Sequence, residues 1–118
     1  MSVPELDDWE MNKFSFCDLP MDRKIYFLSL LAHEITVHAR GTYPEQVKEN
    51  EAIEKLMAFN EIQHLVTSQL RHMLAKDEKR YSDEDFVDIL FKKAQRGGCG
   101  RDLEMAFRFA FKYLPSAK

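Results

Sequence analysis

The sequence predicts an all-α fold, a small four-helix bundle-like domain with an irregular aromatic N-terminal arm. Leu, Met, Ala, Glu, Lys, Gln and Arg fill long segments, and no stretch alternates β-branched with polar residues at period two. The four glycines and four prolines cluster between these segments. Since 118 residues suffice for one hydrophobic core but are short for two, we expect a single domain, with an arm over 1–18 and a helical core over 19–118.

The arm and the first helix follow from the N-terminal third of the chain. Trp9, Phe14 and Phe16 lack helical spacing, so we expect the arm to pack its aromatic side chains onto the bundle. The first helix should run from about Pro20 to Arg40 and end before a glycine. Apolar side chains lie on nearly every side of this helix, which predicts a central position. They are Ile25, Tyr26, Phe27, Leu28, Leu30, Leu31 and Ala32.

The second helix has two possible starting points. Thr42 and Glu45 fit a capping box with Pro44 in the first turn, but the helix can equally begin after Asn50. In either case one apolar stripe at spacings of three and four continues to about Ala75. The stripe contains Leu56, Phe59, Ile62, Val66, Leu70 and Met73.

The last two helices are separated by a glycine-rich turn. A charged connection over 76–81 leads to Ser82 and Asp85, a cap-like pair that predicts the start of the third helix. This helix should end at Gly97. The fourth helix is predicted over 101–114, before a proline.

Composition excludes several classes of protein. Hydrophobic residues make up 45% and charged residues 31% of the chain, which is typical of globular proteins and not of disordered, collagenous or membrane proteins. No apolar run reaches the ~18 residues of a membrane span, and the first ten residues are acidic, unlike a secretory signal. The two cysteines lack CxxC spacing. We therefore expect a cytoplasmic protein with no membrane partner and no cofactor.

Histidine and glutamate pairs form a candidate metal site. Glu34 and His38 lie four residues apart, and Glu61 and His64 lie three apart, so each pair shares a helix face as in bundle metal sites. His33 and His38 are five apart, which differs from the HExxH zinc motif.

The two His/Glu pairs can approach each other only if the second helix begins at the later of its two possible positions. If the second helix begins near Pro44, Glu34 and Glu61 are offset by ~16 Å along the helices, whereas a start after Asn50 reduces the offset to ~6 Å. We favour the alternative interpretation, that these are surface or interface side chains.

The turn over 96–101 is a candidate anion site. Its glycines let backbone N–H groups converge at a helix N-terminus, and the residues proposed to bind are Arg96, Gly98 and Arg101. The turn lacks both the preceding strand of a dinucleotide motif and the Lys-Ser/Thr of a P-loop. The favoured alternative is a tight corner that needs no ligand. Cys99 would have a lowered pKa there if it were exposed, but no base is placed to make it a nucleophile.

Charge is distributed unevenly along the chain. Residues 86–118 contain seven Lys or Arg and three Asp or Glu, whereas residues 1–60 contain six and eleven. Arg101, Arg108 and Lys112 form a basic stripe, which makes nucleic acid or phosphate a possible partner. We do not favour nucleic acid, because Glu104 interrupts the stripe and the whole chain has a net charge of −3.

The fourth helix is apolar on two sides. Leu103, Phe107 and Leu114 should face the core, which leaves Met105 and Phe109 on the far side. Either the aromatic arm or a second chain should cover these two side chains, and they are the candidate interface.

No complete catalytic constellation is present, so an enzyme is not the favoured interpretation. We expect a non-catalytic helical protein-interaction or regulatory module that forms a homodimer or binds another protein. The alternatives are a nucleic-acid or phosphate binder that uses the basic C-terminal third and a His/Glu metal-binding protein.

Overall fold

The computed structural model describes residues 13, 15–41, 49–77 and 80–114. This part of the chain consists of helices and turns without a strand, which confirms the all-α prediction. Its long helices are α2 (Met21–Arg40), α3 (Glu49–Leu74), α4 (Asp83–Arg96) and α5 (Gly100–Lys112).

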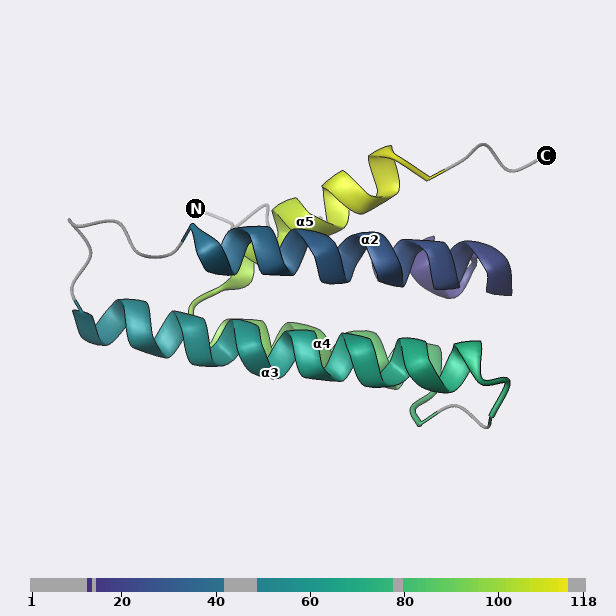
Figure 1. Cartoon of the computed structure of the whole chain (residues 1–118), viewed down its shortest axis with the longest axis horizontal. Helices are drawn as coiled ribbons and strands as arrows, with labels where there is room; N and C mark the ends of the chain where they lie inside the picture. Colours follow the sequence, from purple (N-terminus) through teal and green to yellow (C-terminus); the bar gives the residue numbers. More distant parts are fainter. Residues whose placement is uncertain (1–12, 14, 42–48, 78–79, 115–118) are drawn as a thin grey trace, which may run out of the picture.

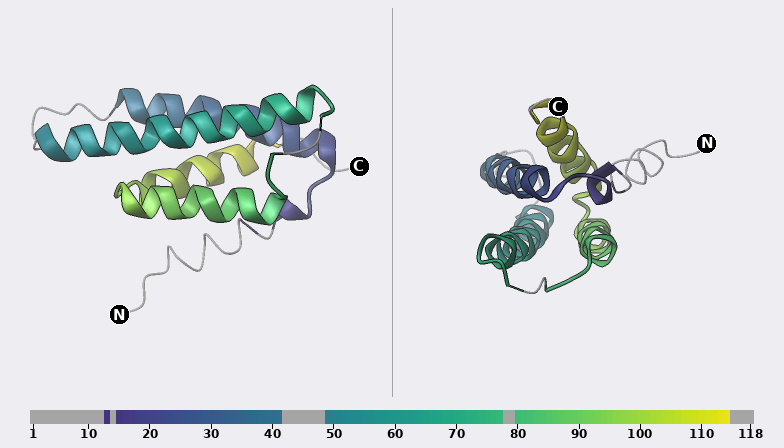
Figure 2. Two further views of the ribbon diagram at one scale, coloured as in Figure 1. Left: turned by 90° about the horizontal axis from the view of Figure 1, so that it is seen from below. Right: turned by 90° about the vertical axis from the view of Figure 1, so that its right-hand side faces the viewer.

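The four helices form a ring in which each packs against its two neighbours (Figures 1 and 2). Successive helices run in opposite directions, so α2 and α3 lie antiparallel side by side, and α4 and α5 complete the ring. α3 and α5 are diagonal to each other when the bundle is viewed from its end. Surfaces on these two helices therefore point to different sides of the molecule.

Local capping sets most helix ends where the sequence predicts them. The Ser82 hydroxyl accepts a hydrogen bond from the backbone N–H of Asp85 at 3.2 Å, which confirms the cap of α4. Gly41 and Gly97 end α2 and α4 as expected. α5 covers 100–112 instead of 101–114, because the backbone N–H of Leu114 reaches only three residues back along the chain.

The predicted start of α3 is only partly described. The described part of this helix begins at Glu49, two residues before Glu51, the first residue of the helix that starts after Asn50. The capping box of Thr42 and Glu45, together with Pro44, lies outside the described residues.

A single aromatic and aliphatic core includes buried residues from all four helices. The ring of Phe27 on α2 lies 5.2 Å from that of Phe107 and 4.6 Å from that of Phe111, both on α5, measured between centroids. Phe91 on α4 contacts Phe107 edge-on at 5.5 Å. α2 is therefore central, but it is not buried on every side, because Tyr26 is 42% exposed.

The described end of the arm closes the core. Phe16 is 1% exposed and its ring contacts those of Phe27 on α2 and Phe86 on α4. This agrees with the expected packing of an arm aromatic onto the bundle. Residues 13 and 15–17 are helical and not irregular, whereas Trp9 and Phe14 lie outside the described residues.

Two ion pairs fix this junction. Lys13 of the arm pairs with Asp88 of α4. Lys24 of α2, which is buried, pairs with Asp83 at the start of α4. Each pair joins segments that are far apart in the sequence, so together they fasten the N-terminal side of the chain to α4.

Candidate functional site

The histidine and glutamate pairs do not form one metal site. Glu34 Oε1 and His38 Nε2 are 4.0 Å apart on α2. Glu61 is directed to α4, where its carboxylate accepts a hydrogen bond from Lys93 Nζ at 3.3 Å. Within the described residues no group of three or more His, Cys, Asp or Glu side chains is placed to hold a metal ion. His64 lies instead among polar side chains on the outer face of α3.

Packing and backbone conformation explain two of the glycines in the α4–α5 turn. A Cβ at Gly97 would lie 2.1 Å from the Cβ of Ala58, so glycine allows the turn to touch α3. Gly98 has a φ of +71°, a conformation that L side chains rarely adopt. The turn therefore requires these glycines even without a ligand.

The surroundings of this turn do not favour an anion. A hollow of about 500 Å³ beside Arg96 and Gly98 is also lined by Glu51, Glu54 and Lys55, and the Lys55 ammonium is paired with Asp102 at 2.9 Å. Two carboxylates at this position oppose the binding of a phosphate by Coulomb repulsion. Arg101 is exposed at the start of α5 but does not line this hollow.

Cys99 does not meet the condition for reactivity. Its side chain is fully buried, and its thiol lies 3.6 Å from the backbone carbonyl oxygen of Lys55. Burial raises the pKa of the Cys99 thiol to about 11, so the thiolate is scarce at neutral pH. Cys99 is a core residue beneath the first turn of α5.

The basic stripe on α5 is partly neutralised. Arg108 donates to the carboxylate of Glu104 from Nε at 3.0 Å, and its Nη2 lies 2.8 Å from the same oxygen. Glu104 is only 6% exposed, so it holds Arg108 close to the helix. The Lys112 ammonium lies 5.7 Å from the ring centroid of Tyr113. Of the three cations of the predicted basic stripe, Arg108 therefore pairs with a carboxylate on its own helix.

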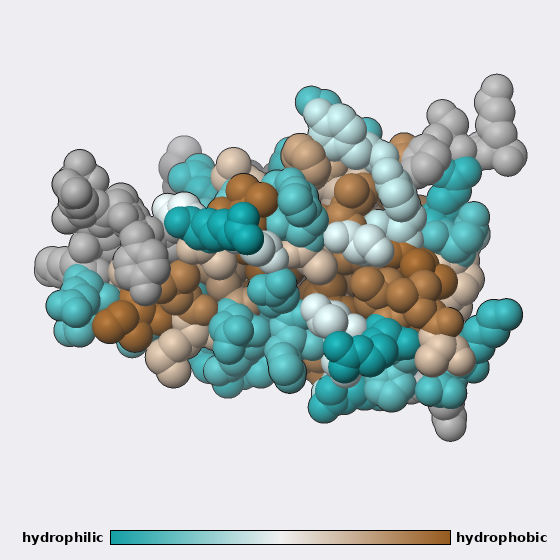
Figure 3. All heavy atoms as spheres, viewed as in Figure 1, coloured by the Kyte–Doolittle hydropathy of each residue, from teal (hydrophilic) through white to brown (hydrophobic). Residues whose placement is uncertain are grey.

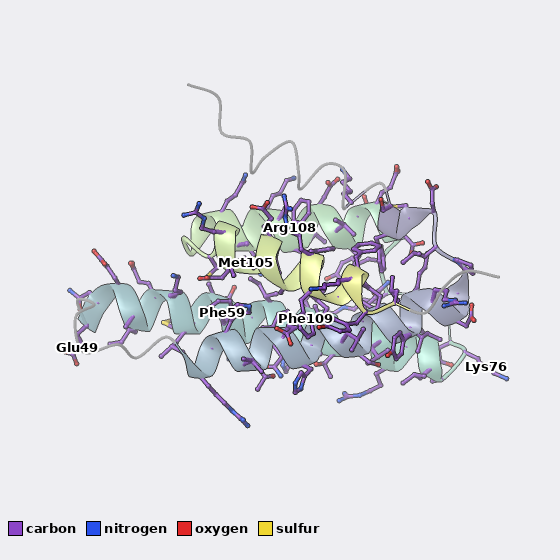
Figure 4. All side chains as sticks on the ribbon, turned by 90° about the horizontal axis from the view of Figure 1, so that it is seen from above. Glu49, Phe59, Lys76, Met105, Arg108 and Phe109 are labelled. Carbon is purple, nitrogen blue, oxygen red and sulfur yellow. The ribbon has the colours of Figure 1, made fainter. Side chains whose placement is uncertain are left out.

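The two faces of α5 are oriented as the sequence predicts. Leu103 and Phe107 are buried in the core, while Met105 is 52% and Phe109 is 37% exposed. Figure 4 labels Met105 and Phe109 on α5. Tyr113 extends this exposed side, because its ring lies 4.6 Å from that of Phe109. We call Met105, Phe109 and Tyr113 the α5 stripe.

Tyr113 is the member of this stripe that the sequence prediction missed. Tyr113 lies four residues after Phe109, and this spacing alone would place it on the same side of the helix. The helix, however, ends at Lys112, one residue before the tyrosine. The stripe is exposed over its whole length, because Tyr113 is 52% exposed.

A second apolar surface lies where α2 begins and α3 ends. Met21 is 45% and Leu74 is 59% exposed, and a hollow of about 460 Å³ is lined by Leu70 and Leu74. Figure 3 shows apolar surface over this end of the two helices. This surface competes with the α5 stripe as a docking face.

A polar groove on the outer face of α3 was not predicted. A hollow of about 290 Å³ is lined by side chains one helical turn apart on α3 and by Arg80 from the connection that precedes α4. The spacing of Asn60, His64, Thr67 and Arg71 indicates that these polar residues share one side of a helix. It does not indicate Arg80, which reaches them only because the chain folds back after α3. We call this hollow the α3 groove.

Comparison with protein families, curated proteins and solved structures gives no match for this chain. No described helix has the length and apolar character needed to cross a membrane. Function must therefore be inferred from the surfaces of the bundle.

Proposed function

We propose that this protein is a non-catalytic helical interaction module that forms a homodimer through the α5 stripe. The observation that carries this proposal is the exposure of Met105, Phe109 and Tyr113 on a helix whose opposite side is fully packed. Contiguous exposed apolar side chains are typical of protein interaction surfaces, particularly where they include aromatic residues and Met.

The stripe is complementary to itself. Its members recur every four residues with Phe109 at the centre, so a two-fold axis can pass close to this residue. In an antiparallel pair of α5 helices Phe109 meets its own copy, and Met105 meets Tyr113 of the partner subunit. The first contact is aromatic with aromatic and the second is sulfur with aromatic, and both are favourable.

The energetic gain is large enough for a dimer. Complete burial of a Phe or Met side chain contributes ~1.5–3 kcal/mol, and a two-fold axis doubles every contact. Arg101 and Lys112 flank the stripe and supply a polar rim. The free cysteines Cys17 and Cys99 agree with a cytoplasmic location, which we include in the proposal.

The decisive experiment is the solution mass of Phe109→Glu. A carboxylate in the apolar contact is unpaired in the dimer but solvated in the monomer, so we expect a helical protein of half the native mass by sedimentation. The matched control is Leu74→Glu, which places the same charge on the other exposed apolar surface. It should retain the native mass, and circular dichroism should show that both variants keep their helices.

Two results would overturn this assignment. If the native protein sediments as a monomer even at high concentration, the α5 stripe does not form a dimer. If Leu74→Glu halves the mass and Phe109→Glu does not, the interface lies at the end where α2 begins and α3 ends.

A further inference from the structure

The α3 groove gathers hydrogen-bond donors without carboxylates. Two arginines, one histidine, two hydroxyl side chains and two amides line it within a volume of about 290 Å³. They are Arg71, Arg80, His64, Thr67, Ser68, Asn60 and Gln63, of which Gln63 already donates a hydrogen bond to Thr36 at 2.7 Å. None of the described residues that line this hollow is acidic.

Arg80 is held in position before any ligand binds. Its Nη1 donates a hydrogen bond to the Ser68 hydroxyl at 2.9 Å, and its guanidinium carbon lies 5.3 Å from the ring centroid of Tyr81. The backbone beside it is also tethered to α3, because the buried Gln69 side chain donates to the Tyr81 carbonyl oxygen at 2.9 Å. These contacts reduce the conformational freedom that Arg80 loses when it binds an anion.

Among the described residues, no acid pairs with the arginines of the α3 groove. In the described part of the chain, neither Arg71 nor Arg80 forms an ion pair. Glu61 lines the adjoining hollow, but it pairs with Lys93 at 3.3 Å. The hollow beside the α4–α5 turn differs in this respect, because it contains Glu51 and Glu54.

We propose that the α3 groove binds the phosphate group of a small phosphorylated ligand. Guanidinium groups match the geometry of phosphate oxygens, and the two arginines converge on the same hollow from different elements. The hydroxyl of Thr67 and the amide of Asn60 supply neutral donors beside them. Because α3 is diagonal to α5 in the ring, this site does not depend on the α5 stripe or on a dimer.

The test is a nuclear magnetic resonance titration of the full chain with inorganic pyrophosphate at constant ionic strength. We expect saturable shifts at the backbone amides of His64, Ser68, Arg71 and Arg80. The double variant Arg71→Gln/Arg80→Gln should bind at least about tenfold more weakly, because each lost charge-assisted hydrogen bond weakens binding on that order.

The control is Arg40→Gln/Lys92→Gln, which removes the same charge from exposed positions outside the groove. It should bind pyrophosphate with native affinity. Equal weakening in both double variants would show that only net charge matters, and the absence of saturable shifts would show that no site exists. Either result would overturn the proposal.

Titrations with inorganic phosphate and with ADP identify the source of the phosphate group. Tighter binding of ADP, with added shifts at Leu65 and Tyr81 in the adjoining hollow, would support a phosphorylated organic ligand. Tighter binding of inorganic phosphate, or equal affinity for both, would overturn that part of the proposal and leave the free anion as the ligand.

Discussion

The inner and outer faces of α5 are both apolar, yet they have different environments. Phe107 on the inner face is 1% exposed and touches rings from α2 and α4. Phe109, two residues later, is 37% exposed and contacts the ring of Tyr113 on its own side of α5. Burial on this helix therefore depends on what lies opposite a side chain and not on its hydropathy. Substitutions on the inner face should therefore change folding, and those on the outer face should change association.

The largest expected effect is on the inner face. Phe107→Ala removes a ring that packs against Phe27 and Phe91, and leaves a cavity that the surrounding helices cannot fill. We expect a loss of ~3–5 kcal/mol in the free energy of unfolding, measured by urea denaturation. A loss below about 1 kcal/mol would contradict the assignment of Phe107 to the core.

The next effect concerns Cys99, the buried residue of the turn that leads into α5. Because the pKa of the Cys99 thiol is raised to about 11 in the folded protein from 9.0 in the unfolded chain, the unfolded state releases its proton first as pH rises. Stability from this group is complete below pH 9 and decreases as pH approaches 11. The expected decrease is roughly 2–3 kcal/mol across this window.

Urea denaturation at pH 8 and at pH 10.5 measures this effect against Cys99→Ala. The variant retains the contribution of other titrating groups but lacks the thiol, so its stability should decrease less over the same interval. An equal decrease in both proteins would contradict the assignment of the effect to Cys99.

A smaller effect is expected from Gly97→Ala. A Cβ at this position would lie 2.1 Å from the Cβ of Ala58, so α3 and the turn must move apart. Overpacking of this kind costs ~1–3 kcal/mol in the free energy of unfolding. Gly41→Ala is the matched control, because its Cβ would meet its nearest neighbour at 3.7 Å, an ordinary contact distance. Equal thermal stability of the two variants would contradict the close approach at Gly97.

Sequence patterns predicted the local parts of this structure and missed the contacts between distant segments. The cap of Ser82 with Asp85 and the ends at Gly41 and Gly97 depend on neighbouring residues, so the sequence alone identified them. The pair of Lys24 with Asp83 joins residues 59 apart, and no local pattern indicates such a contact.

The candidate sites divide in the same way. The orientation of Met105 and Phe109 follows from helical periodicity and was predicted. The α3 groove requires Arg80 to return to Ser68 after the end of α3, which periodicity does not describe. Glu104 was interpreted as an interruption of the basic stripe, although its spacing of four from Arg108 also predicts the ion pair that forms.

The smallest expected effect is on the outer face of α5. Phe109→Ala in dilute solution, where the chain is monomeric, should change the free energy of unfolding by no more than about 0.5 kcal/mol. At high protein concentration the native chain should gain stability relative to this variant, because association stabilises only the folded state. A large loss in dilute solution would assign Phe109 to the core.

The contact of Phe16 with α4 has a consequence for synthesis on the ribosome. Phe16 is made before α3, yet its ring packs against Phe86, and the neighbouring Lys13 pairs with a residue 75 positions later. The contact of Phe16 with Phe86 can therefore form only after α4 has left the exit tunnel, whereas its contact with Phe27 on α2 can form earlier. Binding by a chaperone during this interval should depend on Phe16, because the side of its ring that faces Phe86 is still uncovered.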